Sequence, residues 1–313
     1  MKIGIIGTGF AGQMHSKVLE IINPSTEYYI YDIDPKKADE LTKQRNNGKA
    51  IYSLEDMYRM ADSIIISTPT TTHFKLAINI IKNNKNVLCE KPMALTLNEA
   101  KMMLTEAKKN KKICSIGFNY RFFKITQILK EKELDDIIAI KVTLKRLYRS
   151  NGWHSKENGV LADLGIHLID YITYICNDSI DLENCVANKK YIDGWDYYSN
   201  ICGKTKSGIN FDLVAARTDD PKEVQFSFII CTKKGVIKYD SREENTYSVQ
   251  NRKNIVSYKF EKELKTDGFF DFTDSVLKQD RFWIESIENN KKNEVATFAD
   301  GIEAQKILEY FNS

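Results

Sequence analysis

The sequence predicts two domains of different architecture: an α/β domain with a doubly wound parallel sheet, then an α+β domain with a large, mostly antiparallel open sheet. Through the first 120 residues, short apolar stretches alternate with helical periodicity, as a parallel sheet requires. After residue 120, longer stretches alternate polar and apolar residues, which is typical of antiparallel strands. We therefore expect domains at 1–120 and 121–313, with a C-terminal helix at 298–312 that packs back on the first domain.

The expected strands of the first domain are short and almost wholly apolar, whereas its helices carry apolar residues every three or four positions. The strands are expected at residues 3–6, 28–33, 63–67, 87–89 and 113–117. The helices are expected at residues 10–22, from Pro35 onward, and at 74–81 and 98–109. A proline at the first helical position is well tolerated, so Pro35 suits the start of the second helix.

The second domain begins with a long alternating strand at residues 137–147 and an amphipathic helix at 161–176. From residue 186 to about 260 the pattern is mostly strands and turns, for example at 224–231 and 236–239. Helical periodicity returns at 269–287 and 298–311. This order predicts an antiparallel-rich sheet with helices on one face.

Composition excludes several classes of protein. The chain has 313 residues, 42% of them hydrophobic and 28% charged, which suits two globular domains. Its 46 basic and 43 acidic residues are interspersed, and no basic stripe with aromatic residues stands out, so no nucleic-acid partner is expected. No stretch reaches the roughly 20 apolar residues of a membrane helix, so no membrane association is expected.

The cysteines and histidines argue against disulfides and metal. Six cysteines are scattered without a Cys-x-x-Cys pair, which favours reduced thiols in a cytoplasmic protein. The first residues read as a strand that enters a glycine turn, and not as a signal peptide. The four histidines lack zinc-ligand spacing, so no metal site is expected.

A glycine fingerprint lies between the first strand and the first helix. Gly7 permits a tight turn, Gly9 lets the backbone approach a pyrophosphate, and Gly12 lets helix and strand pack closely, with Phe10 and Ala11 between them. The phosphates would meet N–H groups at the positive end of the helix. The pattern predicts a dinucleotide site in a Rossmann domain, the alternative being a glycine turn without a ligand.

Asp32 follows twenty residues after Gly12, at the end of the second strand. Its carboxylate can accept hydrogen bonds from the adenosine ribose and repels a 2′-phosphate, so NAD is expected. Lys36 and Lys37 lie near enough to bind a 2′-phosphate, which keeps NADP as the alternative. The other interpretation of Asp32 is a turn aspartate that caps the next helix, a role that Asp34 fills more naturally.

Two further sets of residues can move a proton. Lys91 follows an apolar strand at the carboxyl edge of the parallel sheet, where open α/β sheets bind ligands, and Pro92 restricts its backbone. Asp163, His167 and Asp170 fall on one stripe of a helix. A histidine of near-neutral pKa is a natural acceptor when an alcohol loses its proton. The alternatives are a surface lysine and a structural histidine held by its neighbouring aspartates.

Taken in order, these motifs resemble the glucose-fructose oxidoreductase/inositol dehydrogenase/rhizopine catabolism (Gfo/Idh/MocA) family. The matching segments are Gly7–Gly12, Asp32, Thr68-Pro69 with His73, Glu90-Lys91-Pro92, Asn119-Tyr120-Arg121 and the run from Gly159 to Asp170. They extend to about residue 175, and residues 298–311 resemble the closing helix of the family. The chain departs from the family pattern at Asn158, where a glycine is usual, and at His154, where an arginine is frequent.

The resemblance implies roles for particular residues. Catalytic roles are implied for Lys91, Asp163 and His167. Cofactor contacts are implied for Gly7, Gly9, Phe10, Ala11, Gly12, Asp32, Thr68, Pro69, His73, Glu90, Lys91 and Asn119. Substrate contacts are expected from Arg121, Arg146, Tyr148, Trp153 and Asp170, and the basic strand end around Arg146 suits an anionic substrate or a solvated surface.

We therefore expect an NAD(H)-dependent oxidoreductase that transfers a hydride to or from a secondary alcohol or ketone carbon of a sugar, inositol or nucleotide-sugar. His167 would be the acid/base and Lys91 would stabilise the oxygen, and the reverse assignment also fits. The alternatives are a non-catalytic dinucleotide or sugar sensor and a reductase of an imine or linear pyrrole. The resemblance also implies a homodimer or homotetramer formed through the second-domain sheet.

Overall fold

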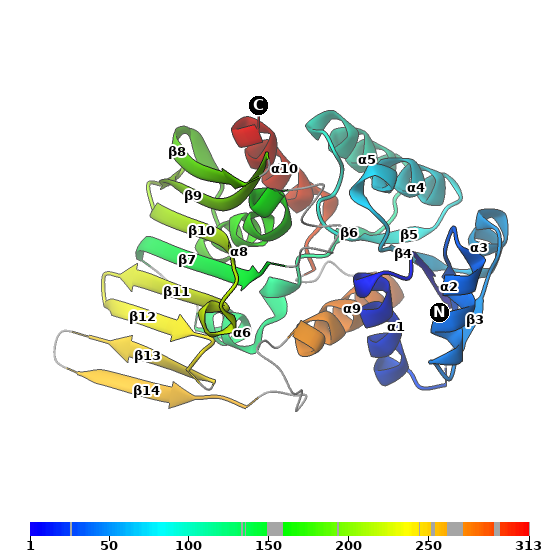
Figure 1. Cartoon of the computed structure of the whole chain (residues 1–313), viewed down its shortest axis with the longest axis horizontal. Helices are drawn as coiled ribbons and strands as arrows, with labels where there is room; N and C mark the ends of the chain where they lie inside the picture. Colours follow the sequence, from blue (N-terminus) through cyan, green and yellow to red (C-terminus); the bar gives the residue numbers. More distant parts are fainter. Residues whose placement is uncertain are drawn as a thin grey trace. The chain divides into compact units, whose positions relative to one another are not determined.

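The computed structural model describes residues 1–25, 27–132, 134, 136–148, 159–192, 194–243, 245–251, 254–261, 272–290 and 295–312. The chain forms two compact units, both visible in Figure 1. One unit comprises Met1–Asn119 with Thr273–Gln305, and the other comprises Tyr120–Phe272 with Lys306–Ser313. A segment near the C-terminus thus belongs to the same unit as the glycine fingerprint.

The first unit contains a six-stranded sheet in the order β3-β2-β1-β4-β5-β6, and every neighbouring pair is parallel. Its strands are β1 (Ile3–Ile6), β2 (Tyr28–Tyr31), β3 (Gly48–Ala50), β4 (Ser63–Ile66), β5 (Asn86–Cys89) and β6 (Cys114–Ile116). Its helices are α1 (Phe10–Ile22), α2 (Pro35–Lys43), α3 (Leu54–Met60), α4 (Thr70–Lys82), α5 (Leu97–Lys109), α9 (Phe272–Glu288) and most of α10 (Phe298–Asn312). The strand order reverses between β1 and β4, which is the switch point where such sheets bind ligands.

Short polar side chains fix where several helices begin. Asp34 accepts a hydrogen bond from the Lys36 N–H at the start of α2, and Ser53 and Thr96 cap α3 and α5 in the same way. Each cap satisfies an N–H group that the helix itself leaves without an intrahelical acceptor. The expectation that Asp34 caps the second helix is confirmed.

The second unit contains an eight-stranded sheet in the order β14-β13-β12-β11-β7-β10-β9-β8. Only the β7–β10 pair is parallel among its described strands. The strands are β7 (Ile137–Leu147), β8 (Ile180–Ile192), β9 (Trp195–Thr205), β10 (Asn210–Thr218), β11 (Gln225–Thr232), β12 (Gly235–Asp240), β13 (Thr246–Gln250) and β14 (Ile255–Lys259). The helical segments are η1 (Asn119–Phe122), α6 (Lys124–Glu131), η2 (Leu161–Gly165), α8 (Ile166–Cys176) and η3 (Pro221–Glu223).

Helix α8 packs on β7 and β10 at the centre of this sheet (Figure 1). The core beneath it is aromatic: the rings of Tyr171 and Phe226 lie 5.3 Å apart, edge to face, and both are fully buried. The predicted fold class, a parallel Rossmann sheet followed by a mostly antiparallel sheet, is confirmed. Among the described residues, we find no helix with the length and hydrophobicity needed to cross a membrane.

Candidate functional site

The three glycines of the fingerprint have different surroundings, and the differences suit a bound phosphate group. Gly7 has φ +100°, and a Cβ on Gly12 would lie only 2.0 Å from the Gly7 carbonyl oxygen. A Cβ on Gly9, in contrast, would meet nothing within 4 Å. The outer glycines are therefore required by the turn itself, whereas Gly9 leaves open space where a ligand can approach the backbone.

The start of helix α1 is suited to an anion. No described side chain caps it at Gly9, and its first turn contains no acidic residue. The N-terminus of a helix carries a partial positive charge and N–H groups that can bind phosphate. Together with the open space at Gly9, this arrangement fits the pyrophosphate of a dinucleotide.

Asp32 connects the fingerprint to the end of β2. One of its carboxylate oxygens accepts hydrogen bonds from the Thr8 backbone N–H at 2.9 Å and the Thr8 hydroxyl at 2.7 Å. The other oxygen accepts from the Asp34 N–H at 3.0 Å. Two carboxylate oxygens offer about four acceptor positions, so the group can fix the loop and still accept a bond from a ribose hydroxyl.

His73 links two loops that follow neighbouring parallel strands. Its Nδ1 lies 2.8 Å from the Pro92 carbonyl oxygen, and its Nε2 lies 2.8 Å from the Thr68 carbonyl oxygen. Burial lowers the pKa of His73, whereas hydrogen bonds to the two backbone carbonyls oppose that shift. The histidine expected beside the cofactor thus holds the loop after β4 against the loop after β5.

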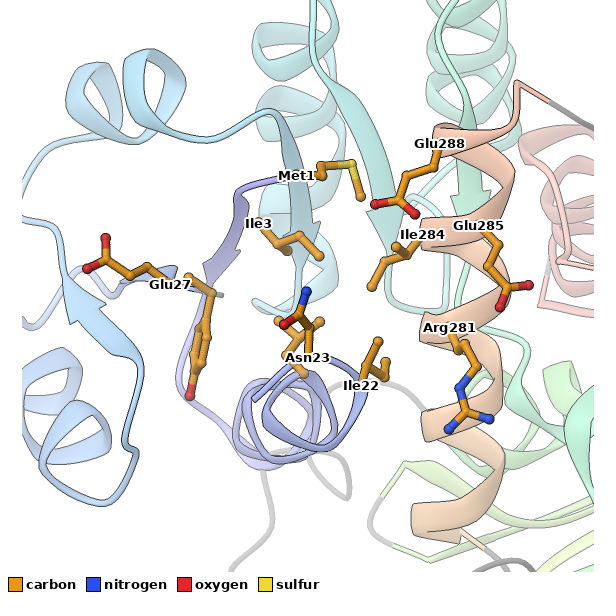
Figure 2. Close-up of a pocket in the computed structure, with 11 residues that line it drawn as sticks. Met1, Ile3, Ile22, Asn23, Glu27, Arg281, Ile284, Glu285 and Glu288 are labelled. Carbon is orange, nitrogen blue, oxygen red and sulfur yellow. The ribbon is translucent and has the colours of Figure 1, made fainter. Parts of the chain in front are cut away.

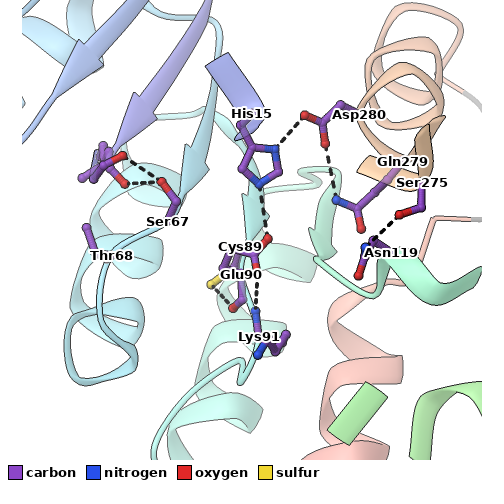
Figure 3. Close-up of polar contacts among 12 residues, drawn as sticks. His15, Ser67, Thr68, Cys89, Glu90, Lys91, Asn119, Ser275, Gln279 and Asp280 are labelled. Carbon is purple, nitrogen blue, oxygen red and sulfur yellow. Dashed lines mark hydrogen bonds and ion pairs between the residues drawn. The ribbon is translucent and has the colours of Figure 1, made fainter. Parts of the chain in front are cut away.

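Lys91 follows β5, and Glu90 before it is held by a buried histidine that the sequence analysis missed (Figure 3). His15 Nε2 lies 3.2 Å from Glu90 Oε1, and His15 Nδ1 lies 2.7 Å from Asp280 Oδ2. His15 belongs to α1, three residues after the last fingerprint glycine, and Asp280 belongs to α9. The helix that carries the fingerprint therefore also contacts the segment that carries the lysine.

Helix α9 brings further polar side chains to this region. Asn119 donates a hydrogen bond to the Ser275 hydroxyl at 2.9 Å, and Gln279 donates to Asp280 at 3.3 Å (Figure 3). Ser275, Gln279 and Asp280 are all buried. In the sequence, these three residues stand out only as polar positions in an amphipathic helix. That pattern does not reveal which residues they contact.

In the second unit, Asp163 lies in a π-helical turn and His167 in the α-helix that follows it. The turn is η2, which leads directly into α8. The sequence analysis expected one regular helix, so the predicted stripe through Asp163 is altered by the wider turn. The His167 ring lies 4.7 Å from the ring of Tyr120, centroid to centroid, and both residues are buried. Single π-turns occur frequently at functional sites.

Arginines contact both aspartates of this region. Arg121 makes a two-pronged ion pair with Asp170, with Nε 2.9 Å from Oδ2 and Nη2 2.5 Å from Oδ1. Asp163 accepts a hydrogen bond from Arg217, a residue that the sequence analysis did not identify. Arg217 lies in β10 beside Arg146 of β7 because those two strands are parallel neighbours.

The remaining predicted substrate residues differ in their surroundings. Arg146 donates a hydrogen bond to the Tyr120 hydroxyl at 3.2 Å, whereas Tyr148 is exposed. Trp153 lies outside the described residues, as do His154 and Asn158, the positions that depart from the family pattern.

The structure explains why position 159 is a glycine. Its φ is +36°, and a Cβ there would overlap Oδ1 of Asp196 at 1.6 Å. Asp196 in turn accepts a hydrogen bond from the Leu161 N–H at 3.0 Å, at the start of the π-turn. The glycine therefore makes room for a side chain that caps this turn.

A pocket of about 280 Å³ lies elsewhere on the first unit (Figure 2). It is lined by residues at the amino ends of β1 and β2, at the end of α1 and on α9. The fingerprint follows the carboxyl end of β1, and open parallel sheets bind cofactors at carboxyl ends. This pocket is therefore not the expected cofactor crevice.

Comparison with known proteins agrees with this geometry. Residues 1–118 match the oxidoreductase family with an NAD-binding Rossmann fold, and residues 122–238 match the Gfo/Idh/MocA C-terminal domain. The chain is 30% identical to glucose-6-phosphate 3-dehydrogenase of Bacillus subtilis, over 99% of this chain and 95% of that protein. It is 29% identical to myo-inositol 2-dehydrogenase of Thermotoga maritima, over 58% of this chain and 56% of that protein.

Solved structures share the fold along the whole chain. Levoglucosan dehydrogenase in complex with NADH and L-sorbose has a TM-score of 0.87 at 17% identity, covering 100% of this chain and 95% of that one. UDP-N-acetylglucosamine 3-dehydrogenase from Acidithiobacillus ferrooxidans has a TM-score of 0.84 at 19% identity, covering 100% and 96%. The fold, the NAD-binding fingerprint and the full-length relative lead to one conclusion: the chain belongs to the Gfo/Idh/MocA family of NAD-binding oxidoreductases.

Proposed function

We propose that the chain is an NAD(H)-dependent dehydrogenase acting on a secondary hydroxyl of a sugar, a sugar phosphate, an inositol or a nucleotide-sugar. The observation that carries this proposal is the position of Lys91, the second residue after β5, at the edge of the sheet where the fingerprint follows β1. A cation at that edge is suited to the oxygen of a substrate that reacts at a nicotinamide ring.

Each polar group has a distinct role in the proposed reaction. NAD⁺, when bound between the fingerprint and Asp32, supplies the hydride acceptor. His167 takes the proton of the substrate hydroxyl during oxidation and returns it during reduction. Lys91 donates a hydrogen bond to the same oxygen and stabilises its developing negative charge. Asp163, held by Arg217, orients the polar groups around the hydroxyl.

The relatives support the choice of substrate class. The full-length relative is named for oxidation of glucose 6-phosphate at carbon 3, and the myo-inositol enzyme is named for the same type of reaction on a cyclic polyol. All of these substrates present secondary hydroxyls on a six-membered ring. We extend that class, and no individual sugar, to this chain.

A substrate screen tests the proposal. Purified protein is incubated with glucose, glucose 6-phosphate, myo-inositol or UDP-N-acetylglucosamine, each with NAD⁺ or NADP⁺, and formation of reduced cofactor is followed by absorbance. Turnover of at least one ring hydroxyl with NAD⁺ is expected, and a Lys91→Met variant should be inactive on the same substrate. Tight cofactor binding without turnover of any substrate would instead favour a sensor. An imine and a linear pyrrole are assayed separately with NADH, and turnover of one of these alone would favour the other reductase.

We also propose that the protein forms a homodimer or homotetramer through the sheet of the second unit. The support is the resemblance to the family and the exposed apolar side chains on that sheet, among them Val186, Ile229 and Ile255. Light scattering after size exclusion should give two or four times the chain mass of 36.1 kDa. A monomer at micromolar concentration would contradict this assembly.

A further inference from the structure

His15 connects three distant parts of the first unit. It lies in α1, it contacts Asp280 of α9 at 2.7 Å, and it contacts Glu90 after β5 at 3.2 Å. His15 and Asp280 are essentially inaccessible, at 1% and 0% exposure, and the side chain of Glu90 is 20% exposed. Polar groups this deeply buried need partners, and His15 is the partner of both carboxyl groups.

The three groups form a row of alternating charges. Burial by itself lowers the pKa of His15, but the carboxylates of Asp280 and Glu90 outweigh that effect and raise the pKa to about 10. Burial alone raises the pKa of Glu90, but the hydrogen bond and charge of His15 and the charge of Lys91 lower it. His15 therefore holds a proton at neutral pH and lies between the carboxyl groups of Asp280 and Glu90.

Glu90 connects His15 to the backbone of Lys91. Its Oε2 accepts a hydrogen bond from the Lys91 backbone N–H at 3.3 Å. Its carboxylate lies against the backbone of Gly117, where a Cβ would be only 2.9 Å from Oε1. On the other side of Lys91, the Pro92 carbonyl contacts His73 at 2.8 Å. The residues before and after Lys91 are thus each fixed by a buried histidine.

We propose that His15 and Asp280 are positioning residues for Lys91, acting through Glu90. Asp280 holds the imidazole ring, the ring holds the Glu90 carboxylate, and the carboxylate fixes the backbone from which the lysine side chain extends. The inference rests on the proposed role of Lys91 in the reaction. Stability alone does not account for such a row, because apolar residues of similar volume often stabilise a core as well as a buried ion pair does.

Two amide variants separate positioning from stability. The amide nitrogen of His15→Asn replaces Nδ1 and keeps the contact with Asp280, whereas that of His15→Gln replaces Nε2 and keeps the contact with Glu90. His15→Asn should lower kcat by roughly 10- to 100-fold, as expected for a misplaced catalytic group. It should lose at least tenfold more kcat than His15→Gln, with little change in KM.

The order of stability should be the opposite. Both variants remove the imidazolium, but only His15→Asn keeps a hydrogen-bond donor on the fully buried carboxylate of Asp280. His15→Gln should therefore unfold at a lower urea concentration than His15→Asn. If kcat and the urea midpoint fall in the same order across the two variants, His15 acts only through stability and the proposal is wrong. The dissociation constant of NADH, measured by fluorescence titration, should stay within about threefold in both variants.

Two spectroscopic measurements are independent of any substrate. With ¹⁵N-labelled histidine, only four residues contribute to the spectrum, and His15 should retain both ring protons from about pH 6 to about pH 9.

Reductive ¹³C-methylation labels the lysines, and the Lys91 signal is assigned with the Lys91→Arg variant. This signal should shift more in His15→Asn than in His15→Gln. An unchanged Lys91 signal in His15→Asn would overturn the positioning role, whereas the absence of turnover in the wild type would contradict only the proposed function.

Discussion

The charge of His15 makes the stability of the first unit depend on pH. Its pKa rises from 6.5 to about 10 on folding because the carboxylates of Asp280 and Glu90 outweigh the effect of burial. Between these two values the folded state holds one proton more than the unfolded state. Stability from this group is therefore fully present below pH 6.5 and is lost as the pH rises toward 10. The total is on the order of 5 kcal/mol, lost at about 1.4 kcal/mol per pH unit.

The assay compares the protein with a variant in which this titration is absent. His15→Gln/Asp280→Asn removes the imidazolium and its fully buried partner together, while Glu90, whose side chain is 20% exposed, is kept in both proteins. Urea unfolding is followed by the fluorescence of Trp283, which is buried in α9. The other two tryptophans, Trp153 and Trp195, are replaced by phenylalanine in both proteins.

The free energy of unfolding is then measured from about pH 7 to about pH 9. Over this interval the parent should lose about 3 kcal/mol more than the double variant, because only the parent holds the extra proton on His15 in the folded state. Two curves that run parallel would show that His15 is not an imidazolium in the folded protein. That result would also remove the charge argument for its positioning role.

Three further predictions concern the proposed reaction and the second unit. His167→Ala should lower kcat by roughly 10²- to 10⁴-fold with unchanged NADH affinity by fluorescence titration, and surviving turnover with lost cofactor affinity would contradict its role. Asp32→Ser should lower the ratio of kcat/KM for NAD⁺ over NADP⁺, and equal use of both by the wild type would refute the NAD assignment. Asp170→Ala should destabilise the second unit by about 3–5 kcal/mol in urea unfolding, because it removes the carboxylate that compensates the buried Arg121. Arg121→Met/Asp170→Leu should be much less destabilised, and equal losses in both would argue against a buried ion pair.

The fold was predictable where one local pattern decided it. The strands Ile3–Ile6 and Ile137–Leu147 were predicted to the residue, because the first is a wholly buried apolar stretch and the second alternates along its length. The strand Gly48–Ala50 and the helix Leu54–Met60 were missed. The strand has three residues at the edge of the sheet, and the helix has seven, so neither is long enough to show a period.

The site was predictable only in part, for a related reason. Lys91 and the fingerprint follow strand ends, so the parallel topology alone brings them to one edge. His15 and Asp280 are 265 residues apart, and nothing local in either segment predicts their contact. Arg217 was missed likewise, because its place beside Arg146 depends on a parallel pairing within a mostly antiparallel sheet.

The buried charges explain why a helix from the end of the chain is needed to complete the first unit. An unpaired carboxylate at the position of Asp280 would cost several kcal/mol, and so would an unpaired imidazolium at His15. Each is tolerated only because the other is present, and Glu90 shares the same proton donor. A change that loosens α9 therefore frees the His15 ring and, through it, the carboxylate that fixes the backbone of Lys91. We expect substitutions that loosen α9 to lower turnover at urea concentrations that leave the parallel sheet folded. The reason is that the sheet is held by its own apolar strands, whereas the backbone of Lys91 is held by the row of charges.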